Sequence, residues 1–278
     1  MADAAQERTL AANRAVHGAL VARGDYQKSQ HFRPENQQKV RALLQQLVAP
    51  LSKERAIDFG CGTGFMIDLM HDQFAEIHGV DITRAMMDRV DLSPGNIQLH
   101  EARAEQTPFP ETHFDFATAY SFMDHLHAVE PFLREVHRVL KPGGVFYAGL
   151  NPHRDYILAM EAAAASETEP TEIIAREIKG ALHNGEHYAE HYGLDATTLE
   201  QAEPIKSVQK GFHPHEIRDL SRTIGFADCR IVYEWFLGQG TVMHQQSFAA
   251  AESMDRHLQS ILPVSAPLYK YLTIILTR

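Results

Sequence analysis

Residues 56–64 read Ala-Ile-Asp-Phe-Gly-Cys-Gly-Thr-Gly, and this stretch decides the fold. It begins as a short apolar run typical of a buried strand, and glycines then stand at every second position, at Gly60, Gly62 and Gly64. A helical pattern starts near Phe65. Glycine lets the backbone approach a ligand closely, and the first turn of a helix presents unpaired N–H groups. The stretch therefore predicts a strand, a ligand-binding turn and a helix.

Short apolar runs alternate with helical segments around that turn. The predicted strands lie at 56–59, 76–80, 97–100, 114–120, 145–150, 229–236 and 271–277, and the predicted helices include 3–23, 35–48, 131–140 and 214–224. The Lys-Pro-Gly-Gly sequence at 141–144 predicts a turn between helix and strand. Strands that alternate with helices form a parallel sheet covered on both faces, so we predict an α/β fold.

Composition excludes several classes of protein. The 278 residues include 36 acidic and 26 basic side chains, and a net charge of −10 would repel a phosphate backbone, so we expect no nucleic-acid partner. Cys61 and Cys229 are too few for a disulfide framework, which fits a reducing compartment. The sequence shows neither a signal peptide nor an apolar run of about 18 residues, so we expect a soluble, cytoplasmic protein with no membrane contact.

Asp81 stands at the carboxyl end of the second predicted strand, beside the glycine turn in a parallel sheet. A carboxylate at that place can accept two hydrogen bonds from ribose hydroxyls. The turn and the carboxylate together predict a site for a nucleoside cofactor.

These residues resemble the class I, Rossmann-like, S-adenosylmethionine-dependent methyltransferase family of the small-molecule type. The family's first motif, acidic-x-Gly-x-Gly-x-Gly, is complete at 58–64, and further motifs match in order at 104–110, 114–120 and 138–144. The resemblance spans roughly residues 50–150, with weaker similarity at 214–236. It implies a mostly parallel, seven-stranded Rossmann-like sheet with helices on both faces.

The resemblance also implies S-adenosyl-L-methionine as cofactor and S-adenosyl-L-homocysteine as product. Asp58 would anchor the amino end of the methionine moiety, Asp81 would hold the ribose, and Ala104 would offer its N–H to the adenine. The residues expected to bind the cofactor are Tyr26, Asp58, Gly60, Cys61, Gly62, Asp81, Ile82, Met86, Ala104, Glu105 and Tyr120. Arg103 departs from the family pattern, which usually has an aspartate there. A guanidinium cannot accept a hydrogen bond from the adenine amino group, so that contact is in doubt.

Methyl transfer from a sulfonium is an in-line displacement, so the enzyme mainly holds the nucleophile and the methyl carbon together. A base that takes the proton of the acceptor would help. His125 follows the fourth strand, where the crevice of such a sheet opens, and is our candidate for that base.

We expect a single domain over 1–278. Its parts are an N-terminal helical cap at 1–50, a cofactor-binding core at 51–152, a helical lid at 153–212 and a C-terminal part of the sheet with a further insertion at 213–278. Substrate specificity should lie in the lid and in 237–269, since inserted segments over strand ends commonly cap the pocket. The composition of these segments also suits a homodimer interface.

His183, His187 and His191 recur every four residues, and His-x-x-Glu-His occurs twice among them, a spacing that some zinc hydrolases use. The Asn184-Gly185 pair weakens a helix at that place, and simple methyl transfer needs no metal. We therefore favour a solvated or lid-forming helix over a metal site.

The sequence predicts a methyltransferase acting on a small molecule, with oxygen or nitrogen favoured over carbon as the acceptor atom. One alternative is a non-catalytic cofactor-binding or scaffold protein of the same fold. A further alternative, an NAD(P)-dependent oxidoreductase, is disfavoured because the third glycine comes one position early for Gly-x-Gly-x-x-Gly and no Tyr-x-x-x-Lys pair is present.

Overall fold

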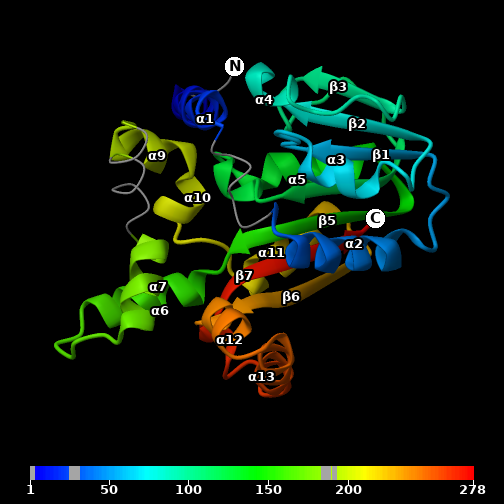
Figure 1. Ribbon diagram of the computed structural model, residues 1–278. Coiled ribbons are helices and arrows are strands. Elements are labelled where there is room, and N and C mark those ends of the chain that lie inside the picture. Colours follow the sequence, from blue (N-terminus) through cyan, green and yellow to red (C-terminus); the bar gives the residue numbers. More distant parts are fainter. Residues whose placement is uncertain (1–3, 25–31, 183–188, 190–192) are drawn as a thin grey trace.

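A seven-stranded sheet organises the molecule (Figure 1). The computed structural model describes residues 4–24, 32–182, 189 and 193–278. The strands are β1 (Arg55–Phe59), β2 (Glu76–Asp81), β3 (Ile97–Glu101), β4 (Phe114–Tyr120), β5 (Leu140–Pro152), β6 (Asp228–Phe236) and β7 (Tyr269–Thr277). Their order across the sheet is β3-β2-β1-β4-β5-β7-β6, and β7 pairs antiparallel with both neighbours while the other pairs are parallel. The predicted seven-stranded, mostly parallel sheet is thereby confirmed.

The helices and helical turns lie between and around these strands. They are α1 (Ala4–Ala22), α2 (Pro34–Val48), α3 (Phe65–Met70), α4 (Arg84–Met87), η3 (Met123–His125), α5 (Val129–Val139), α6 (Arg154–Ala164), α7 (Glu172–Leu182), α9 (Ala196–Ala202), α10 (Pro204–Ser207), α11 (Pro214–Ile224), α12 (Gln239–Gln245), α13 (Phe248–Ser260) and η4 (Ala266–Leu268). Among these described helices, none combines the length and the apolar character that crossing a bilayer requires.

Two apolar cores cover the two faces of the sheet. On one face α5 packs through Phe132 and Val136, in the same cluster as Ile57 of β1. On the other face α2 packs through Leu44, in the same cluster as Ala56 of β1. Neighbouring residues of a strand point to opposite faces, so one buried strand serves both cores. The apolar run that opens the glycine stretch is buried for this reason.

The Lys-Pro-Gly-Gly segment is part of β5, where we predicted a turn. Gly143 has φ +78°, as a turn would require, yet its N–H donates to the Arg278 carbonyl at 2.7 Å, and the Arg278 N–H donates to Gly144 at 3.0 Å. The register between β4 and β5 shifts at this place. The end of the chain therefore supplies strand partners to a segment whose local sequence favours a turn.

The carboxyl ends of the parallel strands carry the longer insertions. Helices α6 to α10 follow β5, and α12 and α13 lie between β6 and β7 (Figure 1). The sheet order reverses between β1 and β4, and ligands of open α/β sheets bind at that switch point. The fold therefore places the glycine turn at the opening of a crevice.

Candidate cofactor and active site

The glycine turn joins β1 to α3 in a left-handed backbone conformation. Gly60 has φ +65° and Gly62 has φ +52°, in a region that side chains with a Cβ rarely occupy. The turn is held to β2 because the Cys61 N–H donates to the Val80 carbonyl at 3.0 Å. The backbone of the turn is thus exposed to the crevice in a fixed position.

Asp81 is fixed beside that turn by backbone amides. Its Oδ2 accepts from the Gly62 N–H at 2.9 Å, and its Oδ1 accepts from the Thr83 N–H at 2.7 Å. Burial raises the pKa of Asp81, and these two amides act in the opposite direction. Each carboxylate oxygen can accept more than one hydrogen bond, so both remain able to receive ligand hydroxyls.

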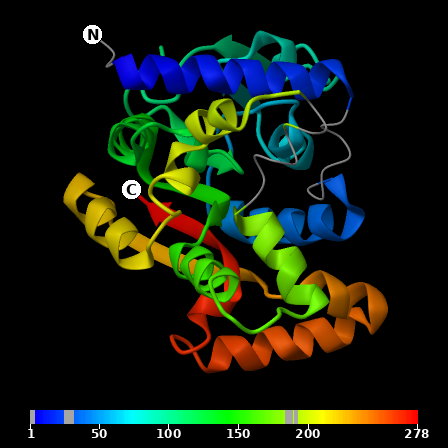
Figure 2. The same cartoon turned by 90° about the vertical axis from the view of Figure 1, so that its left-hand side faces the viewer.

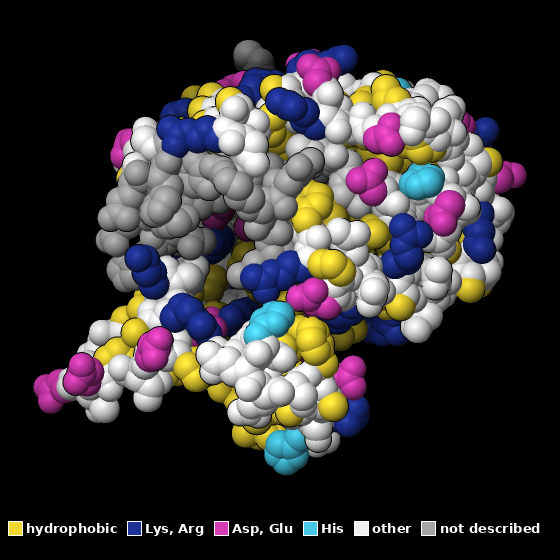
Figure 3. Space-filling view, in the orientation of Figure 1, with side chains coloured by type: hydrophobic (Ala, Val, Ile, Leu, Met, Phe, Trp, Pro, Cys, Tyr) yellow, Lys and Arg dark blue, Asp and Glu magenta, His cyan; other side chains and the backbone are white. Residues whose placement is uncertain are grey.

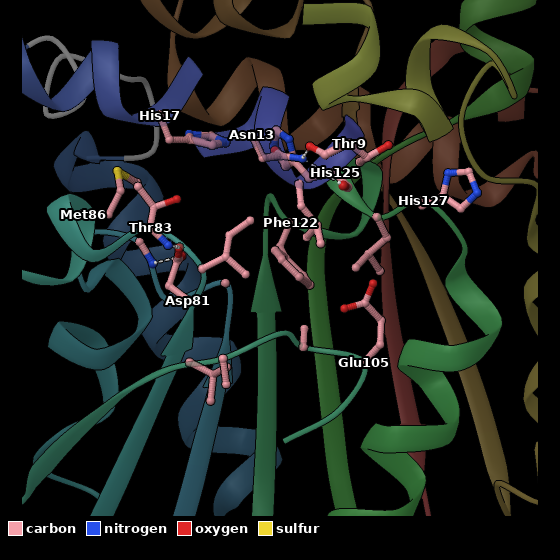
Figure 4. Close-up of a pocket in the computed structure, with 18 of the residues that line it drawn as sticks. Thr9, Asn13, His17, Asp81, Thr83, Met86, Glu105, Phe122, His125 and His127 are labelled. Carbon is pink, nitrogen blue, oxygen red and sulfur yellow. Dashed lines mark hydrogen bonds between the residues drawn. The ribbon is translucent and has the colours of Figure 1, made fainter. Parts of the chain in front are cut away.

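Asp81 lines a cavity of about 700 Å³. We call it the larger cavity, because it is the larger of two cavities that meet at the glycine turn. Figure 4 shows Asp81, Thr83 and Met86 on one side of it and His17 and Asn13 of α1 above. Its lining residues are Gln6, Thr9, Leu10, Asn13, His17, Gly60, Gly62, Val80, Asp81, Ile82, Thr83, Met86, Ala102, Ala104, Glu105, Ser121, Phe122, His125, Leu126 and His127. It combines apolar walls with a few polar groups, as ligand sites commonly do.

A second cavity, of about 370 Å³, adjoins it and is called the smaller cavity. Its lining residues are Phe32, Asp58, Gly60, Cys61, Thr63, Phe65, Met66, Tyr120 and Ser121. Gly60 and Ser121 line both cavities. The two cavities therefore meet at the first glycine of the turn.

Asp58 is the buried carboxyl group of the smaller cavity, with 2% of its surface exposed. Its Oδ1 accepts from the Thr118 hydroxyl at 2.7 Å. Burial raises the pKa of Asp58 to about 7, and the charge of Asp81 acts in the same direction. A ligand cation near Asp58 would restore the charge of this carboxyl.

Phe122 lies where the two cavities meet. A Cβ added to Gly60 would overlap the Phe122 ring. The ring also packs edge-on against Phe132 of α5, at 5.5 Å between centroids. Phe122 thereby leaves no room above Gly60.

His125 faces the larger cavity from η3 (Figure 4). Its Nδ1 lies 3.1 Å from the Ala202 carbonyl, which can only accept, so Nδ1 carries a proton and the neutral ring keeps its lone pair on Nε2. The ring also contacts the edge of His17 at 4.9 Å between centroids. Burial lowers the pKa of His17 to about 3, so that neighbour is neutral.

The structure brings the predicted site residues together, except where they lie outside the described residues. Asp58, Gly60, Cys61 and Tyr120 line the smaller cavity, and Gly60, Gly62, Asp81, Ile82, Met86, Ala104, Glu105 and His125 line the larger one. Tyr26 and the histidines at 183, 187 and 191 are not among the described residues. Within the part of the chain that the structure describes, no group of three His, Cys, Asp or Glu side chains could hold a metal ion.

Arg103, the departure from the family pattern, is not among the residues that line the larger cavity. Its guanidinium lies 3.6 Å from Glu7 of α1 and 4.0 Å from Glu105. The Glu105 carboxylate also accepts from Gln6 of α1 at 3.1 Å. Arg103 and Glu105 therefore connect the core to the N-terminal helix.

Sequence reasoning missed the contribution of α1 to the larger cavity. Four polar residues of this helix line it, namely Gln6, Thr9, Asn13 and His17. They are spaced by three or four residues, so they share one face of the helix. A polar stripe on an otherwise amphipathic helix was the signal that could have found them.

Residues 57–148 match the family model for a methyltransferase domain. Residues 57–148 therefore carry a methyltransferase domain, and the relatives that this part of the chain matches include S-adenosylmethionine-dependent methyltransferases. It is 27% identical over 150 residues to a probable S-adenosylmethionine-dependent methyltransferase from Mycolicibacterium smegmatis, covering 50% of this chain and 58% of that protein. It is 29% identical over 127 residues to a ubiquinone biosynthesis O-methyltransferase from Paracidovorax citrulli, covering 42% and 52%. The chain thus spans about half the length of the curated relatives that it matches.

The fold of this chain is shared with solved structures. Phosphoethanolamine N-methyltransferase 2 from Haemonchus contortus superposes with a TM-score of 0.56 at 14% identity, over 99% of this chain and 60% of that one. The predicted cofactor of the family, S-adenosyl-L-methionine, fits the residues present. The larger cavity offers carboxylate acceptors and apolar walls to a nucleoside, and the smaller cavity offers Asp58 to a cation.

Proposed function

We propose that this chain transfers the methyl group of S-adenosyl-L-methionine to a small-molecule acceptor. The observation that carries the proposal is the pair of cavities that meet at Gly60, with Asp81 in one and Asp58 in the other. One ligand with a ribose at one end and an ammonium group at the other would satisfy both carboxyl groups.

The roles proposed for the cofactor-binding residues are those that the family resemblance implies, and the cavities that these residues line agree with them. Asp81 accepts from the ribose hydroxyls, and Ile82 and Met86 pack on the adenine. The backbone of Gly60, Cys61 and Gly62 runs along the cofactor. A separate contact comes from Asp58, which holds the ammonium group, with Tyr120 beside it in the smaller cavity. Ala104 and Glu105 line the larger cavity, where they would face the adenine. We also propose that Tyr26 closes over the cofactor, because it follows the N-terminal helix in the sequence.

S-Adenosyl-L-methionine, when bound, supplies an electrophilic methyl group on a sulfonium. The chain holds the acceptor in line with that group and removes the proton that the acceptor loses. We assign the proton to Nε2 of His125, since Nδ1 is occupied by the Ala202 carbonyl. Oxygen and nitrogen acceptors suit an imidazole base better than carbon acceptors, whose protons are less acidic. A relative named as an O-methyltransferase supports oxygen in particular.

The N-terminal helix α1 closes the crevice from outside the sheet, since Thr9, Asn13 and His17 line the larger cavity. α1 lies beside α9 over the ends of the strands, and α10 lies on the far side of α9 (Figure 2). We propose that residues 1–50 act as a helical cap and 153–212 as a lid over one domain, which excludes water from the transfer.

The test is a turnover assay with a panel of phenols, hydroxy acids and amines, measuring formation of S-adenosyl-L-homocysteine. The proposal expects formation of this product with at least one class of acceptor, together with saturable binding of S-adenosyl-L-homocysteine by calorimetry. Binding without turnover across all classes would favour the non-catalytic scaffold. Absence of binding would refute the cofactor site itself.

A further inference from the structure

A third cavity, of about 800 Å³, lies beyond the two described above and contains three basic side chains. We call it the basic cavity. Its lining residues are Pro152, Tyr156, Ile157, Arg176, Glu177, Gly180, Ala181, Lys206, Lys270 and Tyr271. In Figure 3 Lys and Arg side chains gather around the hollow left of the centre. Such a cluster is notable in a chain of net charge −10.

Cations exceed carboxylates around the basic cavity. Lys270 pairs with Glu177 at 2.5 Å, and Lys206 pairs with Glu203, which lies outside the lining, at 3.2 Å. The Arg176 guanidinium donates to the Thr241 hydroxyl at 2.6 Å. Among the described residues that line the cavity, three basic side chains stand against one carboxylate, that of Glu177. Clefts of one charge sign concentrate ligands of the other.

Asp124 is a further carboxyl group whose charge acts on Lys206. It is buried, and burial raises its pKa, which favours the neutral form. Burial lowers the pKa of Lys206, but the charges of Glu203, Tyr271 and Asp124 and the hydrogen bond to Glu203 together raise it above its ordinary value. Lys206 therefore keeps its charge in the wall of the cavity.

Strand β5 lies between the basic cavity and the smaller cavity, where we place the methionine end of the cofactor. Tyr271 lines the basic cavity and pairs with Pro152 at the carboxyl end of β5. On the other side of β5, Tyr120 pairs with Gly149 and lines the smaller cavity. Tyr120 and Tyr271 therefore stand on the two strands that flank β5, opposite positions of β5 that are three residues apart.

We propose that the basic cavity binds an anionic group of the methyl acceptor, a carboxylate or a phosphate, so that the reacting atom points past Tyr271 towards Tyr120. This inference rests on the proposed function. Arg176 presents the planar fork that carboxylates and phosphates accept in two hydrogen bonds, and Lys206 and Lys270 supply point charges. Tyr271 adds a hydroxyl group to the wall, while the Tyr156 hydroxyl donates to Glu177 at 2.8 Å.

The direct test is calorimetric titration of the protein loaded with S-adenosyl-L-homocysteine, using inorganic phosphate and benzoate as probes and benzamide as the neutral match, at constant ionic strength. We expect saturable binding of at least one anion and none of benzamide. The anion that binds more tightly separates a phosphate site from a carboxylate site. Failure of both anions to bind at tens of millimolar would overturn the proposal.

Three variants of α7 test which side chains bind the anion. Arg176→Gln should weaken anion binding by about tenfold, because it removes a charge-assisted hydrogen-bond donor. Lys179→Gln removes the same charge from an exposed position of α7 outside the cavity lining, and should change binding less than about twofold. Glu177→Gln should tighten binding, since it removes the carboxylate that competes for Lys270. Equal effects of the two α7 charge losses, or weaker binding by Glu177→Gln, would contradict the assignment.

A comparison of matched acceptors ties the site to the reaction. Among acceptors that yield S-adenosyl-L-homocysteine, the carboxylic acid should have a higher kcat/KM than its amide in the parent protein, and Arg176→Gln should reduce that preference. Product formation without any acid preference would refute the inference and leave the proposed function intact. Anion binding without product formation against any acceptor would refute the proposed function instead.

Discussion

The ring of Phe122 lies against the Cα of Gly60, at the place where the larger and smaller cavities meet. A cofactor that occupies both cavities must pass this place. The ring must therefore turn aside, or yield part of its position, when the cofactor binds. Substitution of Gly60 or of Phe122 therefore tests the two-cavity site most directly.

Gly60→Ala should lose cofactor binding and fold less stably. The new methyl group would overlap Phe122 and would force a side chain into φ +65°. We expect the free energy of unfolding to fall by about 2–5 kcal/mol, from left-handed strain and overpacking together. Gly95→Ala is the matched control, since Gly95 has φ +81° with open space around it, and should cost about 1–2 kcal/mol. Denaturant unfolding measures both, and equal losses would refute the contact.

Phe122→Ala should speed the association of S-adenosyl-L-homocysteine. If the ring has to move first, its removal should raise the association rate constant about three- to tenfold. Stopped-flow fluorescence measures this rate. Phe248→Ala, which truncates an exposed ring of α13, should leave the rate unchanged. An unaltered rate in Phe122→Ala would show that the ring does not limit entry.

Asp81→Asn should weaken binding of S-adenosyl-L-homocysteine by about 1–3 kcal/mol, because the charged acceptor of the ribose hydroxyls is lost. Calorimetry gives the affinity directly. Asp91→Asn is the control, since Asp91 also accepts a backbone N–H two residues on, from Ser93, but is exposed and away from the cavities. The ribose assignment fails if the two variants behave alike.

Affinity for S-adenosyl-L-homocysteine should rise with pH between about 6 and 8. The pKa of Asp58 is raised by burial to about 7, so the empty site is partly protonated there, while a bound ammonium group favours the carboxylate. Binding should therefore release a proton, which calorimetry in buffers of different ionisation enthalpy detects. Asp58→Asn should remove the pH dependence. The affinity for 5′-methylthioadenosine, which lacks the ammonium group, should not depend on pH. An affinity for this ligand that rises with pH would indicate that another carboxyl group is responsible.

His125→Ala should lower turnover by about 10²–10⁴-fold while the affinity for S-adenosyl-L-homocysteine changes little, as expected for loss of a general base. Steady-state kinetics with an acceptor from the panel, together with calorimetry, separate the two quantities. His257→Ala, at an exposed position of α13, is the control. A loss of affinity as large as the loss of turnover would assign His125 to nucleoside binding.

Local sequence was sufficient to predict the bounds of those elements whose own residue pattern marks where they begin and end. The strand at 114–120 and the helix at 214–224 have the predicted bounds, because apolar periodicity, Pro214 and Gly225 mark them without reference to the rest of the chain. The glycine turn and Asp81 were predictable for the same reason, since backbone conformation and strand ends are local properties.

Features that depend on distant partners were not predictable from local sequence. The turn expected at 141–144 is strand because Arg278 pairs with it across the sheet. The polar face of α1 lines the larger cavity only because that helix crosses the strand ends, and the basic cavity gathers Arg176, Lys206 and Lys270 from three separate elements. Single-sequence patterns do not encode which elements meet.

The small apolar cluster between α1 and α9 has its own consequence. Val16 and Leu20 pack on Leu199 and Ala202, apart from both sheet cores, and Asn13 donates to the carbonyls of His125 and Ala202. α1 roofs the larger cavity and meets the core there through polar contacts such as Gln6 with Glu105, so we expect that the roof can lift without unfolding the sheet. A nucleoside product bound beneath the roof would then be released only when the roof opens. In that case the opening motion, rather than methyl transfer, would limit the turnover rate.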